Sequence, residues 1–212
     1  MEKYIFGPQV IKLNVTEELV SELLECGLRQ TTPYNKVLVG KIEREFGFST
    51  EEKNNMANKI RPYIDLYLKE LQENKREKIK LNSIFDNIWI NIQKTKEYNP
   101  PHTHSGHLSF VIYIKIDEEI YKEKNETSGA PAGSITFQYG FANKIMGFNN
   151  GVLQKIEDLV SPTYSFTHLP LVGEMFIFPA YLTHQVESFN TPDVERISIA
   201  GNIILKSTNG LL

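Results

Sequence analysis

Three of the chain's five histidines lie within six residues, at His102, His104 and His107. In extended backbone, residues two apart project to the same side, so the imidazoles of His102 and His104 can reach one metal ion. By the same parity His107 points elsewhere. A lone His-x-His pair is a weak motif, because two loop histidines are often simply solvated. The pair therefore predicts a metal site only if a third ligand exists.

His184 is the candidate for that third ligand. It follows the apolar run Phe176-Ile177-Phe178, which ends at Pro179, and a short turn then leads into the next predicted strand. This position places His184 at the rim of a sheet. We expect His102, His104 and His184 to bind one metal ion, while His168 has no partner pattern and is expected to be structural.

Arg196 begins an alternating run twelve residues beyond His184. Arg196 and Ser198 share one face of this run, and Ile197 and Ile199 share the other. A buried arginine is costly unless it meets an anion, and its planar fork suits two-point contact with a carboxylate. The alternative is a structural salt bridge to an acidic residue of the protein.

Short apolar or alternating runs, separated by Asn, Gly, Pro and Asp, dominate the sequence from residue 84 onward. Such runs are typical of a body rich in strands. Strands are predicted at residues 88–92, 108–116, 134–139, 174–178, 184–189 and 197–205. Two long segments between them, 117–131 and 141–170, are expected to be loops, either lids over the site or tolerated surface insertions.

The first 83 residues carry helical patterns with a few strand-like runs. Residues 9–15 predict a strand, and Thr16 is a helix N-cap before an apolar stripe. The β-branched run at 36–42 predicts another strand. Ser49 with Glu52 forms a capping box for a second helix, which Pro62 should kink or divide.

Helices followed by many strands favour an α+β, mainly β fold, closed as a sandwich or jelly roll with the N-terminal helices packed on the sheet. At 212 residues the chain is long enough for one sizeable core, so we expect a single domain (1–212), with a support region at 1–83 and a β core at 84–212. The charged stretch at 75–78 is expected to be a solvated helix end.

The net charge of −3 gives no general basic field, so no nucleic-acid partner is indicated. The sequence has a single cysteine, Cys26, which excludes a disulfide framework. Cys26 lies in a helical pattern and is expected to be a buried hydrophobe. The sequence has neither a signal-like start nor a run long enough for a membrane span, so a cytoplasmic setting is predicted. Exposed sheet edges near either terminus could support a homodimer.

Taken in order, these motifs resemble the 2-oxoglutarate/Fe(II) dioxygenases, closest to the prolyl 4-hydroxylase-like oxygenases of bacteria and phages. The resemblance covers residues 84–205 and rests on an ordered set of motifs, namely Trp89-Ile90-Asn91, His102-Thr103-His104, Phe178-Pro179, His184 and Arg196-Ile197-Ser198. It implies a double-stranded β-helix with Fe(II) at one open end. It also implies that 2-oxoglutarate and O₂ are co-substrates.

By this resemblance, His102 and His184 would be iron ligands, and Arg196 would bind the C5 carboxylate of 2-oxoglutarate. Ser198 and a hydroxyl from Tyr113 would support the same carboxylate. Residues proposed for the substrate wall are Trp89, Asn91, Tyr98, Asn99 and His107, and core packing is the alternative role for Trp89. The implied reaction hydroxylates a small-molecule or peptidyl substrate, with peptidyl proline as one candidate, and releases succinate and CO₂.

One position departs from the family pattern. The family's first motif is His-x-Asp or His-x-Glu, whereas this chain has His104 at the corresponding place. Either His104 is a third neutral ligand or a carboxylate comes from elsewhere, and His107 could instead be the second ligand. Two alternatives to the dioxygenase follow, a cupin-like jelly roll that binds metal without 2-oxoglutarate and a structural or virion-assembly protein with a vestigial site. Arg196 and Ser198 discriminate against both.

Overall fold

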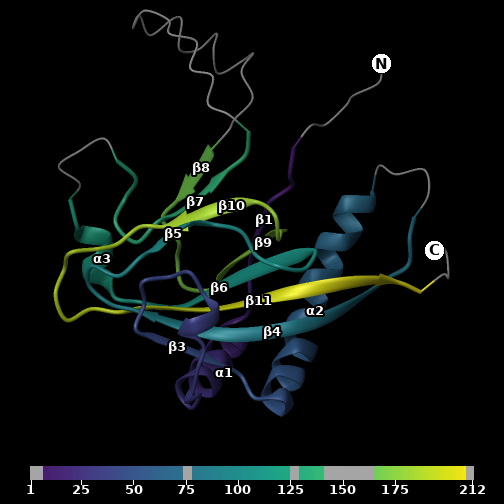
Figure 1. Cartoon of the computed structure of the whole chain (residues 1–212), viewed down its shortest axis with the longest axis horizontal. Coiled ribbons are helices and arrows are strands. Elements are labelled where there is room, and N and C mark those ends of the chain that lie inside the picture. The colour runs from purple at the N-terminus through teal and green to yellow at the C-terminus, as the bar shows by residue number, and fades with distance from the viewer. Residues whose placement is uncertain (1–6, 74–77, 125–128, 141–164, 209–212) are drawn as a thin grey trace, which may run out of the picture.

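The computed structural model describes residues 7–73, 78–124, 129–140 and 165–208. In this described part the strands form two sheets that face each other (Figure 1). The major sheet has seven strands in the order β1-β9-β6-β11-β4-β3-β2, and the minor sheet has four in the order β5-β10-β7-β8. All of the strand pairs are antiparallel.

The major sheet is built around β11 (Arg196–Ser207), which pairs with β4 (Leu81–Gln93) on one side and with β6 (Leu108–Ile116) on the other. Beyond β6 lie β9 (Glu174–Pro179) and β1 (Ile11–Asn14), and beyond β4 lie β3 (Arg44–Gly47) and β2 (Thr32–Pro33). The minor sheet contains β5 (Asn99–His102), β10 (Thr183–Val186), β7 (Ile135–Gln138) and β8 (Ser165–His168).

Two helices cover the outer face of the major sheet, α1 (Glu17–Leu28) and α2 (Thr50–Gln72) (Figure 1). Their first turns are capped as predicted, because Thr16 Oγ1 accepts from Leu19 N at 3.2 Å and Ser49 Oγ accepts from Glu52 N at 3.3 Å. No helix in the described residues combines the length and apolar character needed to cross a bilayer.

The alternation along β11 separates two apolar clusters. Ile197, Ile199 and Ile203 pack with the helices on the outer face of the major sheet. Ala200 belongs to the cluster between the two sheets, which also contains Tyr113. The inward face of β11 therefore carries Arg196 and Ser198 into the space between the sheets, as the alternation predicts.

Several local predictions were wrong. Residues 36–42 do not form a strand, because the chain makes the short 3-10 helix η1 (Asn35–Val37) and the strand comes later, at β3. The segment 117–131, predicted as a loop, contains the helix α3 (Glu118–Lys122). α2 runs through Pro62 as one helix, so the alternative that Pro62 divides the helix is wrong.

The long loop predicted at 141–170 ends in a strand, β8, which pairs with β7. Residues 141–164, where most of the predicted lid lies, are outside the described residues, as are residues 75–77 of the charged stretch. Cys26 is buried as expected, with 3% of its surface exposed.

Candidate metal and 2-oxoglutarate site

The three predicted histidine ligands come together at one end of the minor sheet. His102 and His184 are directly opposed partners in the pairing of β5 with β10. His104 follows two residues after His102, and its backbone N–H donates to Ala180 O at 2.8 Å, which holds it beside the turn before β10. One ligand nitrogen from each of His102, His104 and His184 lies within 4.8 Å of the others.

Backbone carbonyls orient two of these rings. His102 Nδ1 lies 2.7 Å from Pro100 O, and His184 Nδ1 lies 3.0 Å from Leu182 O. A ring nitrogen that faces a carbonyl carries the proton, so the Nε2 atom of each neutral ring keeps a free lone pair for a metal ion. His104 Nε2 and His184 Nε2 face each other at 3.2 Å, an arrangement that a shared cation would stabilise.

Burial keeps the three histidines neutral. It lowers the pKa of His102, and it lowers the pKa of His104 to about 4 and that of His184 to about 3. The neighbouring imidazoles are a second cause of the lowered pKa values of His104 and His184, because two positive charges would repel each other. At neutral pH all three rings are available as ligands without first losing a proton.

This cluster contains imidazoles alone. Among the described residues, no aspartate or glutamate joins His102, His104 and His184 within ligand distance. Three neutral ligands leave the full charge of a divalent ion uncompensated, which strengthens its attraction for an anionic co-substrate. The residues present fit a divalent metal bound mainly by nitrogen, with open positions for other ligands.

Arg196 lies in the cavity that the histidines also line. Its side chain is buried, with 3% exposed, and Nη1 donates to Gln93 Oε1 at 2.5 Å. The guanidinium carbon lies 4.8 Å from the centre of the Tyr113 ring, and Nε has no hydrogen-bond partner. In the described residues no acidic side chain forms an ion pair with Arg196. The predicted alternative of a structural salt bridge is therefore absent from this part of the chain.

Two hydroxyl groups accompany the arginine. Tyr113 is fully buried on β6 and its Oη has no hydrogen-bond partner. Burial raises the pKa of Tyr113, partly opposed by the positive charge of Arg196, so the phenol remains protonated and can donate. Ser198 Oγ accepts from Asn91 Nδ2 at 3.4 Å and keeps its own proton free. A buried cation, an unused N–H and free hydroxyl donors together suit a carboxylate.

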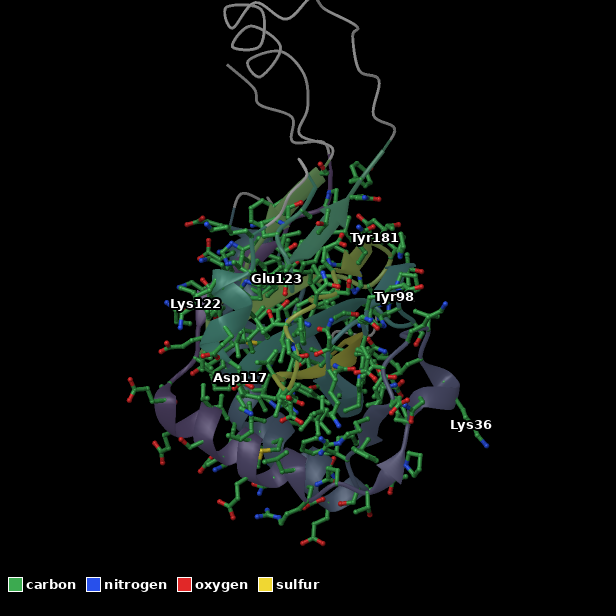
Figure 2. The ribbon with its side chains drawn as sticks, turned by 90° about the vertical axis from the view of Figure 1, so that its left-hand side faces the viewer. Lys36, Tyr98, Asp117, Lys122, Glu123 and Tyr181 are labelled. Atoms are coloured by element: carbon green, nitrogen blue, oxygen red, sulfur yellow. The ribbon has the colours of Figure 1, made fainter. Side chains whose placement is uncertain are left out.

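The helix α3 fixes the turn that precedes Arg196. The carboxylate of Glu123, just after α3, accepts from the backbone N–H groups of Asn190 and Thr191 at 2.8 to 3.0 Å and from Thr191 Oγ1 at 2.8 Å. Asp117 Oδ2, just before α3, accepts from Glu195 N at 2.8 Å. Figure 2 labels Asp117, Lys122 and Glu123 on this face of the molecule. The two acids thus hold the backbone that leads into β11.

Three of the predicted wall residues, Trp89, Asn91 and Asn99, line the cavity. Trp89 Nε1 donates to Asn91 Oδ1 at 3.1 Å, so the tryptophan is both packed and connected to the polar wall. His107 is not among the cavity residues, because its ring accepts from Leu205 N at the exposed end of β11. Tyr98 also lies outside the cavity, with the Lys41 ammonium 5.5 Å from its ring centre. His168 contacts Glu174 at 2.6 Å, in agreement with a structural role.

Two polar residues of the site are missing from the sequence-based set. Gln93, which contacts Arg196, shares the inward face of β4 with Trp89 and Asn91, so alternation along that strand could have identified it. Glu45 lines the cavity from β3 and is buried, with 1% exposed. The sequence contains no signal for Glu45, because no strand was predicted at Arg44–Gly47.

Two facing antiparallel sheets with a histidine cluster at one end and a buried arginine between them define a metal-binding double-stranded β-helix protein. The sequence profile of the family described as "Putative 2OG-Fe(II) oxygenase" matches residues 87–202. The chain belongs to this family. It is an oxidoreductase that depends on Fe(II) and 2-oxoglutarate and uses O₂.

Solved structures share this fold. A Pseudomonas putida prolyl-4-hydroxylase has 11% sequence identity and a TM-score of 0.53, over 91% of this chain and 90% of that chain. The viral collagen prolyl hydroxylase of Paramecium bursaria Chlorella virus-1 has 14% identity and a TM-score of 0.51, over 92% and 94% of the two chains.

The non-haem alpha-ketoglutarate-dependent epimerase SnoN, from nogalamycin biosynthesis, has 14% identity and a TM-score of 0.56, over 93% of this chain and 77% of that chain. No curated protein matches the sequence. At these identities the structural matches show the fold, so the primary substrate has to be argued from the cavity itself.

Proposed function

We propose that the chain hydroxylates an organic substrate, with Fe(II) bound by His102, His104 and His184 and with 2-oxoglutarate held by Arg196. The observation that carries this proposal is a buried guanidinium with a free N–H in the cavity of the histidine cluster. A metal protein that binds no acidic co-substrate has no use for such a group, because burying an unpaired cation is costly.

Each residue has a separate part in this scheme. Arg196, Tyr113 and Ser198 bind the distal C5 carboxylate, and the imidazoles hold the metal end. Fe(II) would supply the site at which 2-oxoglutarate and O₂ react. The apolar wall, including Val111, Phe178 and Val186, excludes water from the reacting atoms.

The substrate remains a proposal. The prolyl hydroxylases of similar fold make peptidyl proline one candidate, while SnoN is an epimerase, so the fold alone does not select a reaction partner. A cytoplasmic setting, the lack of a nucleic-acid partner and the possibility of a homodimer stay predictions from the sequence.

The proposal is tested by Arg196→Leu. Removing the two-point, charge-assisted contact should weaken 2-oxoglutarate binding by about 3–5 kcal/mol, which is roughly a hundred- to several-thousand-fold, while metal content stays near wild type. The measurement is an anaerobic titration of the Fe(II)-loaded protein that follows the weak visible band of the Fe(II)–2-oxoglutarate chelate.

Arg44→Leu is the matched control, because Arg44 pairs with Glu195 near the surface, at 2.9 Å, and does not line the cavity. It should leave the titration unchanged. Equal 2-oxoglutarate affinity in Arg196→Leu and wild type would contradict the role given to Arg196. The absence of any chelate band in the wild-type protein would favour the cupin-like alternative.

A further inference from the structure

Two polar atoms in the cavity wall have no role in holding iron or 2-oxoglutarate. Glu45 Oε2 and Asn99 Oδ1 are buried and have no hydrogen-bond partner. Glu45 lies on β3 opposite Asn91, and Asn99 is the first residue of β5, so the two come from different sheets and line the same cavity. Buried oxygens without donors are costly, which points to a ligand that supplies the donor.

The two side chains converge on Gly40. A Cβ atom at Gly40 would lie 2.0 Å from Asn99 Oδ1 and 3.2 Å from Glu45 Oε1. The carboxyl group of Glu45 and the amide of Asn99 therefore lie side by side next to Gly40, and the Asn99 side chain takes the space that a Cβ would need. A group with several N–H donors matches such a pair of acceptors better than a single hydroxyl does.

The charge around Glu45 favours a cation. Burial raises the pKa of Glu45 to about 7, and the negative charge of Glu97 adds to this shift. Among the described residues no basic side chain forms an ion pair with Glu45. The nearby Lys41 ammonium lies over the Tyr98 ring. A positively charged ligand would supply the missing counter-charge.

We propose that Glu45 and Asn99 form a substrate subsite for a cationic nitrogen, an ammonium or guanidinium group on an aliphatic stem. The adjoining wall is formed by Val37, Leu38 and Val39, and Val37 and Val39 are 67% and 54% exposed. This apolar segment suits the methylene stem of a lysine- or arginine-like group. The inference rests on the proposed function, since it takes the molecule held here to be the one that is oxidised.

The chain's single tryptophan, Trp89, lines this cavity and reports its occupancy. The probe is n-butylammonium, titrated against Trp89 fluorescence in the metal-free protein and again with Fe(II) and 2-oxoglutarate under anaerobic conditions. Its neutral counterpart is 1-butanol. We expect saturable binding of n-butylammonium, weakened at least tenfold in Glu45→Gln, whereas 1-butanol should bind more weakly and equally to both proteins.

Glu43→Gln is the matched control, since Glu43 is exposed two residues away and loses the same charge. It should change the affinity for n-butylammonium less than twofold. Gly40→Ala should weaken binding while Glu45 remains, because its Cβ would lie 2.0 Å from Asn99 Oδ1 and would displace that side chain. Equal affinity for n-butylammonium in Glu45→Gln and wild type, or binding no tighter than that of 1-butanol, would overturn the subsite.

The 2-oxoglutarate titration separates this result from the proposed function. Glu45→Gln should bind 2-oxoglutarate with wild-type affinity, because Glu45 makes no contact with Arg196. If the wild-type protein binds n-butylammonium at Glu45 but fails to bind 2-oxoglutarate, the proposed function is wrong and the cation site stands on its own. If it binds 2-oxoglutarate but shows no Glu45-dependent cation binding, only the subsite is wrong.

Discussion

The proposed metal ligands differ from the wider family pattern by one charge. A carboxylate in the second position would partly neutralise a divalent ion, whereas His104 leaves that charge in place. The surrounding structure is consistent with an imidazole there, since the His104 ring packs 5.6 Å from Trp89 and is largely buried. An aspartate at this position would be shorter and would bring its own charge.

Substitution of the histidines tests their individual parts. His102→Ala or His184→Ala should abolish stoichiometric metal, because each removes one of two rings already oriented by backbone carbonyls. His104→Asp should keep the metal, since it restores two histidines and one carboxylate. Metal content of the purified proteins is the measurement. Iron retained in both alanine variants would contradict the assignment, and iron lost in His104→Asp would mean that the geometry requires imidazole.

Glu45 makes stability depend on pH. The pKa of Glu45 in the folded protein, about 7, lies above its ordinary value of 4.5. Below pH 4.5 the carboxyl group is therefore protonated in both the folded and the unfolded state, and its ionisation does not lower the stability there. As the pH rises from 4.5 through 7, Glu45 ionises more readily in the unfolded chain than in the folded protein, so the folded state loses stability. Glu45→Gln should remove this loss.

We expect Glu45→Gln to be about as stable as wild type at pH 4.5 and more stable than wild type by about 2 kcal/mol at pH 8. Urea unfolding at the two pH values measures the difference, and exposed Glu43→Gln serves as the reference. A constant difference across this range would mean that Glu45 titrates as it does in the unfolded chain.

At the scale of the elements, β11 contains a close backbone approach. It lies between β4 and β6, and at Gly201 a Cβ atom would meet Asn87 O and a ring carbon of Phe110, each at 2.7 Å. A backbone carbonyl inside a sheet cannot move aside as the end of a side chain can. The strand that carries Arg196 and Ser198 is therefore held in place by a close approach that needs glycine.

Gly201→Ala should accordingly destabilise the protein by about 2–3 kcal/mol, because it overpacks the centre of the major sheet. Chemical unfolding measures this change, and Lys206→Ala, at the exposed end of the same strand, should stay within about 0.5 kcal/mol of wild type. A neutral Gly201→Ala variant would show that β4 can shift to make room.

Strands with strong alternation or long apolar runs could be predicted from the sequence, and weakly patterned ones could not. The prediction at 108–116 matches β6, where nearly every residue is buried. β3 and β8 were missed because Arg44–Gly47 and Ser165–His168 carry little apolar signal and depend on pairing with β4 and β7. The competing run at 36–42 has stronger β propensity, yet it remains outside the sheets apart from a bridge at Lys41.

The same distinction holds for the site. The spacing of two residues in extended backbone predicted that His102 and His104 could lie together, and they do, although β5 ends at His102. Alternation along β11 predicted that Arg196 and Ser198 would share one face, and both line the cavity. Glu45 could not be predicted, because its burial arises only when β3 joins the edge of β4. Glu45 is a buried acid without a partner only because the sheets assemble around it, and the local sequence does not show this.

At the scale of the whole molecule, the site joins the two sheets. The histidines lie on or beside β5 and β10 of the minor sheet, whereas Arg196 lies on β11 of the major sheet. A co-substrate held at both ends would therefore connect them. We expect Fe(II) and 2-oxoglutarate together to raise the midpoint of thermal unfolding more than the sum of their separate effects.

A ligand that binds only the folded state stabilises it by about 2.7 kcal/mol at a hundred times its Kd. Anaerobic thermal unfolding is measured without ligand, with Fe(II) alone, with 2-oxoglutarate alone and with both. Arg196→Leu should remove the added effect of 2-oxoglutarate. Purely additive effects in wild type would mean that the two ligands bind independently and do not connect the sheets.

The pairing of β1 with β9 has a consequence for synthesis on the ribosome. Ile11 is opposite Ile177, so β1 leaves the exit tunnel more than 160 residues before its partner strand. α1 and α2 likewise emerge before β11, the central strand of the sheet they cover. We expect the nascent chain to stay unprotected against protease until β11 has been translated, and then to become resistant in one step.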